Sequence, residues 1–352
     1  MKTKAAVQFS LDGPLEIVDL ETPDPNGNQV LVKMFSSGVC HSQLHQMSNP
    51  RLPRPLVLGH EGTGIVTKIG NKVTHVTEGD HVIVTWVKRI QVKGAAPEET
   101  SGASYQKTLV NGRNVYTLAE DVLTNADYVV PISKEYPTDI SCIVGCAVLT
   151  GAGAVINTAK VRPGDSVAVF GAGGVGLCAL QAASITNAYP IIAVDLDNEK
   201  LKFAKEFGAT HLINASEVNS VEQIKDITNG GTDYSFDAIG VKATNEQILE
   251  STRAGGSGAD NIGGTAVLIG LPHSNHTMSI PPRLIVGGQR RYIGSLGATY
   301  PDTDFPMYLG WYKNGEFPLD KLITRRYKLD DINQAYKSLS NGEILGRSIV
   351  TY

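Results

Sequence analysis

The stretch that decides the fold is DSVAVFGAGGVGLCALQAASITNAYPIIAVDLDNEK, which runs from Asp165 to Lys200. It begins with a short apolar run, passes through a glycine-rich turn and continues into a segment of small and apolar residues. A second apolar run, PIIAVDLD, follows and ends in acidic residues. Strand, glycine turn, helix and strand in this order predict a βαβ unit with two parallel strands.

The glycines of this turn fit a dinucleotide site. Gly171 permits a tight turn, Gly173 lets the backbone approach a pyrophosphate, and Gly176 lets the helix pack closely on the strand. The pyrophosphate then lies at the positive end of the helix dipole. Such turns also occur without a ligand, so the motif alone is weak. Asp195 at the end of the next strand strengthens it, because its carboxylate accepts hydrogen bonds from ribose hydroxyls and repels a 2′-phosphate, which favours NAD(H) over NADP(H). Lys200 is close enough in sequence to lie along the same ribose, although a lysine at a helix start is more often solvated.

The same pattern continues toward the C-terminus. Four more apolar runs, HLINAS, YSFDAIG, GTAVLIG and RRYIGSLG, alternate with helical segments. Nearly all-apolar strands that alternate with helices of about 10–15 residues indicate a parallel sheet covered on both faces. We therefore predict a doubly wound Rossmann domain of the α/β class over residues 156–295.

The first part of the chain has shorter runs of alternating apolar and polar residues. These are KAAVQF, LEIVDLE, QVLVKMFSSGV, GIVTKIG and HVIVTW, separated by Gly, Pro, Asn and Asp. They predict a small β-barrel-like domain over residues 1–155. The tail, residues 296–352, contains one helical pattern, DDINQAYKSLSNGE, and one strand pattern, GRSIVTY. It is too short for a domain, so we expect it to complete the first one.

The composition limits the partners that the protein is expected to have. The chain has 352 residues, 41% of them hydrophobic, which suffices for two domains, and its net charge of −4 gives no reason to expect a nucleic acid or an anionic membrane as partner. No apolar run approaches the roughly 20 residues of a membrane span, and the N-terminus MKTKAAVQFSLDG has no apolar signal core. We expect a soluble, cytoplasmic protein.

The segment GVCHSQLHQMSNPRLPRPLVLGHEG, from Gly38 to Gly62, carries one cysteine, three histidines and a glutamate. Thiolate and imidazole are zinc donors. Cys40 and His60 lie on either side of a loop and follow neither C-x-x-C nor H-E-x-x-H spacing, so spacing alone leaves a metal site the minority interpretation. The glycines around His60 and a third thiol, Cys146 in GCAVLTGAGAV just before the nucleotide domain, strengthen it. The other two of the four cysteines are expected to be reduced core residues.

Together these motifs resemble those of the zinc-dependent medium-chain alcohol dehydrogenases. The resemblance rests on GVCHSQLH, on the signature GHE-x-x-G-x5-G-x-x-V, on GCAVLTGAGAV, and on GAGGVG followed by VDLDNEK. It covers essentially the whole chain. It implies a GroES-like β-barrel catalytic domain, with the active site in the cleft against the Rossmann domain.

The resemblance also implies a role for each matching residue. Ser42 would hydrogen-bond the substrate oxygen, His45 would continue a proton relay to solvent, and Glu61 would lie behind the metal as a transient or supporting ligand. Trp86 would line the substrate pocket, although it is also a plausible core residue. The implied ligands of the catalytic zinc are Cys40, His60 and Cys146. The implied cofactor contacts are His41 and Arg347 on the pyrophosphate, Thr150 and Val175 on the nicotinamide, and Gly171, Gly173, Gly174, Gly176, Asp195 and Lys200 along the rest of the dinucleotide.

Two departures from the family pattern stand out. Gln43 occupies a position where an aspartate commonly supports the ligand histidine, and an amide brings no charge to that role. The segment KRIQVKGAAPEETSGASYQK, residues 88–107, has none of the four closely spaced cysteines of a structural zinc lobe. We therefore expect one catalytic zinc per chain and no structural zinc.

The predicted function is reversible hydride transfer between an alcohol or aldehyde carbon and C4 of the nicotinamide of NAD(H), that of a zinc alcohol dehydrogenase or aldehyde reductase (EC 1.1.1.-). A zinc-free quinone or enone reductase of the same fold is an alternative, but it would have no use for the three ligands together. A non-catalytic NAD-binding protein is another. The family resemblance implies a homodimer or homotetramer, and it leaves the identity and charge of the substrate open.

Overall fold

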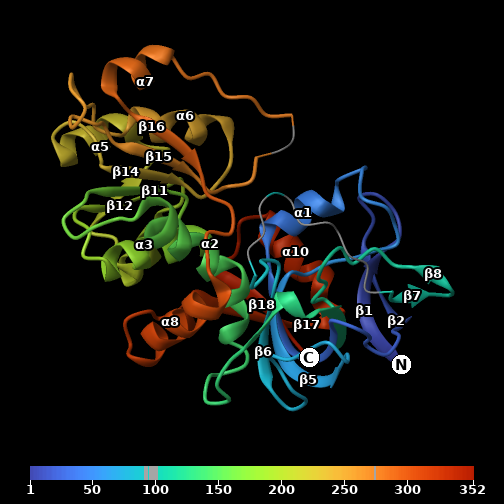
Figure 1. The fold of residues 1–352 in the computed structure, drawn as a ribbon. Helices are drawn as coiled ribbons and strands as arrows, with labels where there is room; N and C mark the ends of the chain where they lie inside the picture. Colours follow the sequence, from blue (N-terminus) through green and yellow to red (C-terminus); the bar gives the residue numbers. More distant parts are fainter. Residues whose placement is uncertain (91–93, 95–101, 273–274) are drawn as a thin grey trace. The chain divides into compact units, whose positions relative to one another are not determined.

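The computed structural model describes residues 1–90, 94, 102–272 and 275–352 (Figure 1). The chain divides into two compact units. Unit 1 comprises Met1–Cys146, Tyr300–Gly315 and Leu319–Tyr352, and unit 2 comprises Ala147–Thr299 and Glu316–Pro318. The functional domain boundaries at residues 155–156 and 295–296 stay a prediction, because compactness alone does not define a functional domain. No helix of the described part is long and apolar enough to cross a membrane.

Unit 1 is built on two sheets. The larger has the strand order β10-β6-β5-β3-β18-β17, with β9 also paired to β3, and the smaller has the order β4-β1-β2-β7-β8. The bounds in the larger sheet are β3 (Gln29–Val39), β5 (Glu61–Ile69), β6 (His81–Thr85), β9 (Asp121–Asn125), β10 (Val129–Pro131), β17 (Ile323–Lys328) and β18 (Arg347–Thr351). Those in the smaller sheet are β1 (Lys2–Gln8), β2 (Leu15–Glu21), β4 (Leu56–Val57), β7 (Ser104–Tyr105) and β8 (Thr108–Leu109). The predicted short strands are confirmed, and their inward residues form a valine-rich core.

The tail of the chain is part of the larger sheet. β18 pairs antiparallel with β3 and parallel with β17, so a strand near the C-terminus lies beside one from the first 40 residues. The tail also supplies the helices α8 (Pro301–Lys313), α9 (Leu319–Leu322) and α10 (Ile332–Ser340). The sequence patterns had indicated α10 and β18 but not α8, α9 or β17.

A short helix, α1 (His41–Met47), occupies the segment expected to be a loop. Its apolar residues Leu44 and Met47 pack against a core cluster that includes Ile332 and Tyr336 of α10. A helix this short is marginal by itself, so its stability comes from this tertiary packing. No local pattern in the sequence indicates such support.

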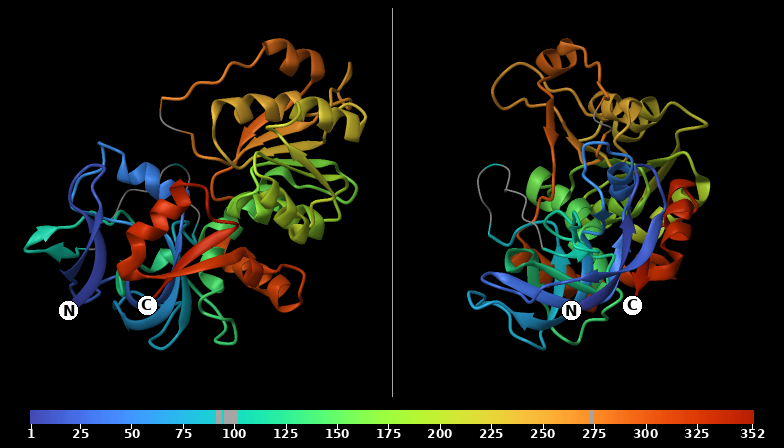
Figure 2. Two further views of the ribbon diagram at one scale, coloured as in Figure 1. Left: turned by 180° about the vertical axis from the view of Figure 1, so that it is seen from behind. Right: turned by 90° about the vertical axis from the view of Figure 1, so that its right-hand side faces the viewer.

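Unit 2 is a parallel sheet of order β13-β12-β11-β14-β15-β16, which confirms the predicted doubly wound fold. Its strands are β11 (Val167–Phe170), β12 (Ile191–Asp195), β13 (His211–Asn214), β14 (Tyr234–Asp237), β15 (Thr265–Leu268) and β16 (Arg291–Gly294). Its helices are α2 (Ala147–Gly153), α3 (Gly174–Ile185), α4 (Asn198–Ala204), α5 (Ser220–Thr228), α6 (Lys242–Glu250) and α7 (Pro282–Gly288). Helices α3 and α4 pack on β11, β12 and β13, and α6 packs on β14 and β15 (Figure 2). Helix α7 was not predicted.

Candidate metal centre and nucleotide loop

Four side chains of unit 1 form a possible metal-binding group. Cys40, His60, Glu61 and Cys146 each offer one ligand atom, and these atoms all lie within 4.8 Å of one another. His60 Nε2 is 3.3 Å from Cys146 Sγ. Both cysteines are buried, with 7% of each residue exposed. The structure thus gathers the three predicted zinc ligands and Glu61.

Strand pairing explains how distant residues meet. Cys40 follows the end of β3, and His60 precedes the start of β5. The antiparallel register of these strands places Ser37 opposite Gly62, which brings the two ends together. Cys146 arrives from the other side, directly after a 3₁₀ turn over Ser141–Gly145 that packs on β5 and β6.

The electrostatics favour a thiolate at Cys40. A hydrogen bond with Cys146 holds the pKa of the Cys40 thiol well below its ordinary value, against the opposing effect of burial, and the charges of Arg347 and His60 act in the same direction. Ser42 Oγ donates a hydrogen bond to Cys40 Sγ over 3.3 Å. The thiolate is the form of cysteine that binds metals.

Glu61, one of these four residues, forms a buried ion pair with Arg347. Glu61 is fully buried and only 5% of Arg347 is exposed, and the guanidinium Nη2 contacts Glu61 Oε1. A Cβ at Gly38 would collide with the Glu61 carboxyl, so this glycine leaves room for the pair. The predicted contact of Arg347 with a pyrophosphate stays a prediction.

The donor set fits a zinc ion. Two thiols, an imidazole and a nearby carboxylate are the ligand types that zinc prefers, and three protein ligands are typical of a catalytic site, where the metal keeps an open position. Cys142 and Cys178 differ from the two cluster thiols. Both are fully buried, and burial raises the pKa of Cys142 to about 12 and raises that of Cys178 as well, so core packing explains them.

Helix α1 carries the residues predicted to relay protons and contact phosphate. The rings of His41 and His45 are 5.3 Å apart in an edge-to-face arrangement, one helical turn from each other. His41 is exposed, whereas Ser42 and His45 are partly buried. Trp86 follows β6 and packs, partly buried, against the barrel core, so the structure adds no observation specific to a substrate pocket. These roles stay predictions.

The glycines of the loop in unit 2 differ in the room around them. Gly171 has a φ of +98°, which favours glycine. A Cβ at Gly176 would collide with the carbonyl oxygen of Gly171, whereas a Cβ at Gly173 would have no described atom within 4 Å. Gly173 is the N-cap of α3 and Gly174 its first residue. The loop is therefore closed on the helix side and open at Gly173.

Asp195 is fixed at the end of β12 by backbone amides. One oxygen accepts the N–H of Ala172 over 2.8 Å, and the other accepts those of Leu196 and Asp197 over 2.8 and 3.1 Å. Lys200 is partly buried in the first turn of α4. Thr150 in α2 and Val175 in α3 also lie in one region, because α2 packs so closely on α3 that a Cβ at Gly151 would collide with the Val175 carbonyl.

Sequence reasoning missed two buried polar groups next to these sites. The Asp237 carboxylate, at the end of β14, accepts hydrogen bonds from the N–H groups of Ile239 and Gly240 over 2.7 and 3.1 Å and fixes the loop that follows. Its position at the end of a parallel strand was a usable signal. The other is Tyr336 of α10, whose hydroxyl donates to Gln43 Oε1 over 2.7 Å, and no local pattern marks it.

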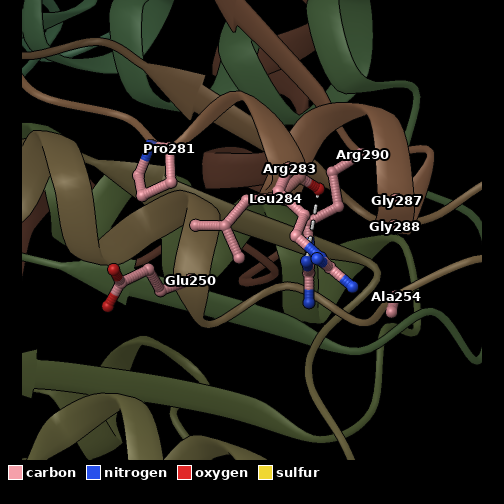
Figure 3. A pocket seen from close by; sticks show the side chains of 8 residues that line it. All are labelled: Glu250, Ala254, Pro281, Arg283, Leu284, Gly287, Gly288 and Arg290. Atoms are coloured by element: carbon pink, nitrogen blue, oxygen red, sulfur yellow. Dashed lines mark hydrogen bonds between the residues drawn. The ribbon is translucent and has the colours of Figure 1, made fainter.

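A separate cavity lies in unit 2 beside α7. Its volume is about 510 Å³, and its lining is Glu250, Ala254, Pro281, Arg283, Leu284, Gly287, Gly288 and Arg290 (Figure 3). Arg290 donates hydrogen bonds to the carbonyls of Thr252 and Leu284 over 3.0 and 3.3 Å. None of the predicted site residues lines this cavity.

Comparison with known proteins agrees with the fold. Residues 26–134 match the alcohol dehydrogenase GroES-like domain, and residues 174–314 match the zinc-binding dehydrogenase family. The chain is 35% identical to S-(hydroxymethyl)glutathione dehydrogenase of Synechocystis sp. and 33% identical to that of Paracoccus denitrificans, in each case over 100% of both chains.

Solved structures of alcohol dehydrogenases also resemble this chain. An alcohol dehydrogenase zinc-binding domain protein from Burkholderia ambifaria superposes with a TM-score of 0.90 at 31% identity. Benzyl alcohol dehydrogenase from Acinetobacter calcoaceticus superposes with a TM-score of 0.88 at 30% identity, and both comparisons cover 100% of this chain and 99% of the other. The class of protein is thus an alcohol-oxidising oxidoreductase.

The chain belongs to the zinc-dependent medium-chain alcohol dehydrogenase family. The predicted family, fold class and enzyme activity are confirmed, and zinc and NAD(H) are the cofactors that membership implies.

Proposed function

We propose that this alcohol dehydrogenase holds one zinc ion per chain through Cys40, His60 and Cys146 and that it uses NAD(H) to interconvert primary alcohols and aldehydes. The observation that carries the proposal is the group of four possible ligand atoms, all within 4.8 Å of one another, in a chain of this family. A zinc-free reductase or a non-catalytic NAD-binding protein has no need of such a group.

Each cofactor supplies one part of the chemistry. A zinc ion bound there supplies Lewis acidity at the substrate oxygen. NAD supplies the hydride acceptor, and its reduced form supplies the donor. The residues of the chain then have to place the substrate and move one proton.

Ser42 and His45 are proposed to move that proton. The Ser42 hydroxyl is next to Cys40 Sγ, so it lies within reach of a substrate oxygen at the metal centre. We propose that Ser42 accepts the alcohol proton as it donates its own toward His45, which passes a proton to water. Glu61 is proposed to stay ionised beside Arg347, which keeps a negative charge behind the ligands without exposing it to solvent.

The cofactor is proposed to bind along the glycine loop, with Asp195 accepting hydrogen bonds from the adenosine ribose. In the family that the sequence resembles, an arginine is often found at the position of His41, and we expect the imidazole to bind the pyrophosphate less tightly. Comparison of kcat/KM with NAD and NADP tests the assignment to NAD. We expect NAD to be preferred, and Asp195→Ala to reduce the preference. A preference for NADP in the unaltered protein would contradict it.

The substrate proposal rests on what the relatives act on. S-(hydroxymethyl)glutathione and benzyl alcohol, named for two of the relatives above, both carry a primary alcohol group. We therefore propose a substrate with a –CH₂OH group. A panel of S-(hydroxymethyl)glutathione, benzyl alcohol, straight-chain primary alcohols and matched secondary alcohols tests this, with primary alcohols expected to give the higher kcat/KM.

Metal analysis of the purified protein tests the metal centre. We expect about one zinc per chain, loss of activity on chelation and its recovery with added zinc. Two zinc ions per chain would show that a further site exists, although the chain has only four cysteines and residues 91–93 and 95–101 lie outside the described part. Activity that survives complete metal removal would exclude the proposed mechanism.

Assembly into a homodimer or homotetramer through unit 2 is also proposed. In the described part of the chain, the edge strand β16 pairs with β15 alone, and Ile285 and Val286 of the neighbouring α7 are exposed. Light scattering after size-exclusion chromatography measures the mass. A monomer at micromolar concentration would contradict this proposal.

A further inference from the structure

A buried hydrogen-bonded chain links the C-terminal helix to the turn that carries Cys40. Gln43 is fully buried, and its Oε1 accepts the backbone N–H of Cys40 over 2.9 Å. The same oxygen accepts the hydroxyl of Tyr336 over 2.7 Å. Tyr336 belongs to α10 and is only 3% exposed. The three groups therefore join residues from opposite ends of the chain.

The direction of these hydrogen bonds follows from the groups themselves. A backbone N–H only donates, so the Gln43 atom that faces Cys40 is the amide oxygen. The Tyr336 hydroxyl must then donate to the same oxygen. Burial raises the pKa of Tyr336 well above its ordinary value, so the hydroxyl keeps its proton. Gln43 Nε2 has no hydrogen-bond partner in the described part of the chain.

The position of Gln43 in the helix makes this contact structural. Cys40 is the N-cap of α1 and has extended backbone angles, with φ −115° and ψ 141°, while Gln43 is the third residue of the helix. A side chain there that reaches back to the N-cap N–H fixes the angle at which the chain enters the helix. Here that angle also sets where the Cys40 side chain points.

We propose that Gln43 and Tyr336 act together as positioning residues for the metal centre, holding the backbone of Cys40 so that its thiolate meets the metal. The inference deepens the proposed function, since it rests on Cys40 as a zinc ligand. It differs from the expectation raised by the family aspartate, because the amide oxygen bonds to Cys40 and Tyr336 rather than to the histidine ligand. The metal centre would then depend on the tail of the chain.

Helix α10 has other attachments, so the role of the hydroxyl can be separated from docking of the helix. Asn333 exchanges two hydrogen bonds with the backbone of Leu15, over 2.9 and 2.8 Å. Leu329, Ile332 and Ala335 also belong to the buried cluster at this surface. Tyr336→Phe removes the hydroxyl alone and leaves these contacts in place.

The test compares zinc binding in Tyr336→Phe and in a matched control, Tyr116→Phe. Tyr116 is also buried in unit 1, and its hydroxyl accepts the N–H of Leu123 over 3.3 Å in the barrel core. Competition with a chromogenic chelator gives the zinc dissociation constant, and Co²⁺ substitution gives the thiolate-to-metal absorption band. For partners of this kind, loss of metal affinity is typically about 10–100-fold. We expect about tenfold weaker zinc binding and a shifted band in Tyr336→Phe, and neither change in Tyr116→Phe.

Further measurements separate positioning from general damage. The KM for NADH should stay unchanged in Tyr336→Phe while kcat falls, because the glycine loop is untouched. Gln43→Leu should weaken zinc binding at least as much, and adding Tyr336→Phe to it should cost little more, since the hydroxyl acts through the amide.

These outcomes distinguish failure of the proposed function from failure of the positioning role of Gln43 and Tyr336. If the unaltered protein binds no zinc, the proposed function fails. If it binds zinc and Tyr336→Phe behaves like Tyr116→Phe, or if the effects of Gln43→Leu and Tyr336→Phe simply add, the positioning role alone is wrong.

Discussion

The metal centre of unit 1 and the glycine loop of unit 2 are built in opposite ways. The metal centre gathers side chains from separate places in the sequence, and its geometry depends on the pairing of β3 with β5 and on the turn before Cys146. The loop lies within Gly171–Gly176, and its geometry is that of the backbone. A site made of side chains should fail when any member is lost, whereas a site made of backbone should fail only where an added Cβ has no room.

Removal of a metal ligand should have the largest effect. Cys146→Ser replaces a thiolate donor with a weak one, and we expect loss of zinc and a fall in kcat/KM of about 10³-fold, since Lewis-acid stabilisation supplies several kcal/mol. Metal analysis and NADH-coupled assays measure both. Cys178→Ser, also at a buried cysteine, is the control and should keep its zinc. If Cys178→Ser lost zinc to the same extent, Cys146 would have no specific role as a zinc ligand.

Breaking the buried ion pair should have the next largest effect. Glu61→Gln leaves the Arg347 guanidinium buried without its counter-charge, which typically destabilises a protein by about 3 kcal/mol or more. Urea unfolding of the metal-free protein measures this without interference from zinc. Glu199→Gln removes the exposed pair with Lys202 and should leave stability unchanged. Equal free energies of unfolding in the two variants would mean that the buried pair does not stabilise the protein.

Two glycines of one loop should respond differently. Gly176→Ala forces a Cβ against the Gly171 carbonyl, and overpacking of this kind costs about 1–3 kcal/mol of stability. A Cβ at Gly173 meets no described atom, so Gly173→Ala should not change stability. NADH binding should weaken by about tenfold if the added methyl group occupies the space proposed for the pyrophosphate. Thermal unfolding and NADH fluorescence titration measure the two effects. Unchanged NADH binding in Gly173→Ala would mean that the cofactor does not approach there.

The smallest expected effect is a difference in thiol labelling between Cys40 and Cys142. In protein stripped of metal, Cys40 should react with iodoacetamide at a lower pH than Cys142, because the pKa of Cys40 is lowered and that of Cys142 is raised. Cys142 has a pKa raised to about 12, so its thiolate fraction at pH 8 is small and grows about 100-fold by pH 10. Mass spectrometry across this range should show labelling of Cys142 that rises with pH and labelling of Cys40 that is already greater than that of Cys142 at pH 8. Parallel titration of the two would contradict the assignment.

The same contrast explains what the sequence could predict. The glycine loop and the parallel strands follow from neighbouring residues, so local patterns indicated them. Helix α1 did not, because Leu44 and Met47 are supported by α10, far along the chain. The ligand set emerged from motifs that resemble those of a family, not from spacing. The contacts of Gln43 with Tyr336 and of Glu61 with Arg347 join distant segments, and no local periodicity shows which buried groups will meet.

The place of β18 in the sheet of unit 1 also bears on how the protein is made. β3 pairs with β18, and residues of unit 2 are synthesised between them. Domains generally fold as units in the order in which they leave the ribosome. Unit 2 can therefore fold before the tail that completes unit 1, which includes Tyr336 and Arg347, has been synthesised. The metal centre would then take its final form only after β18 and α10 have been synthesised.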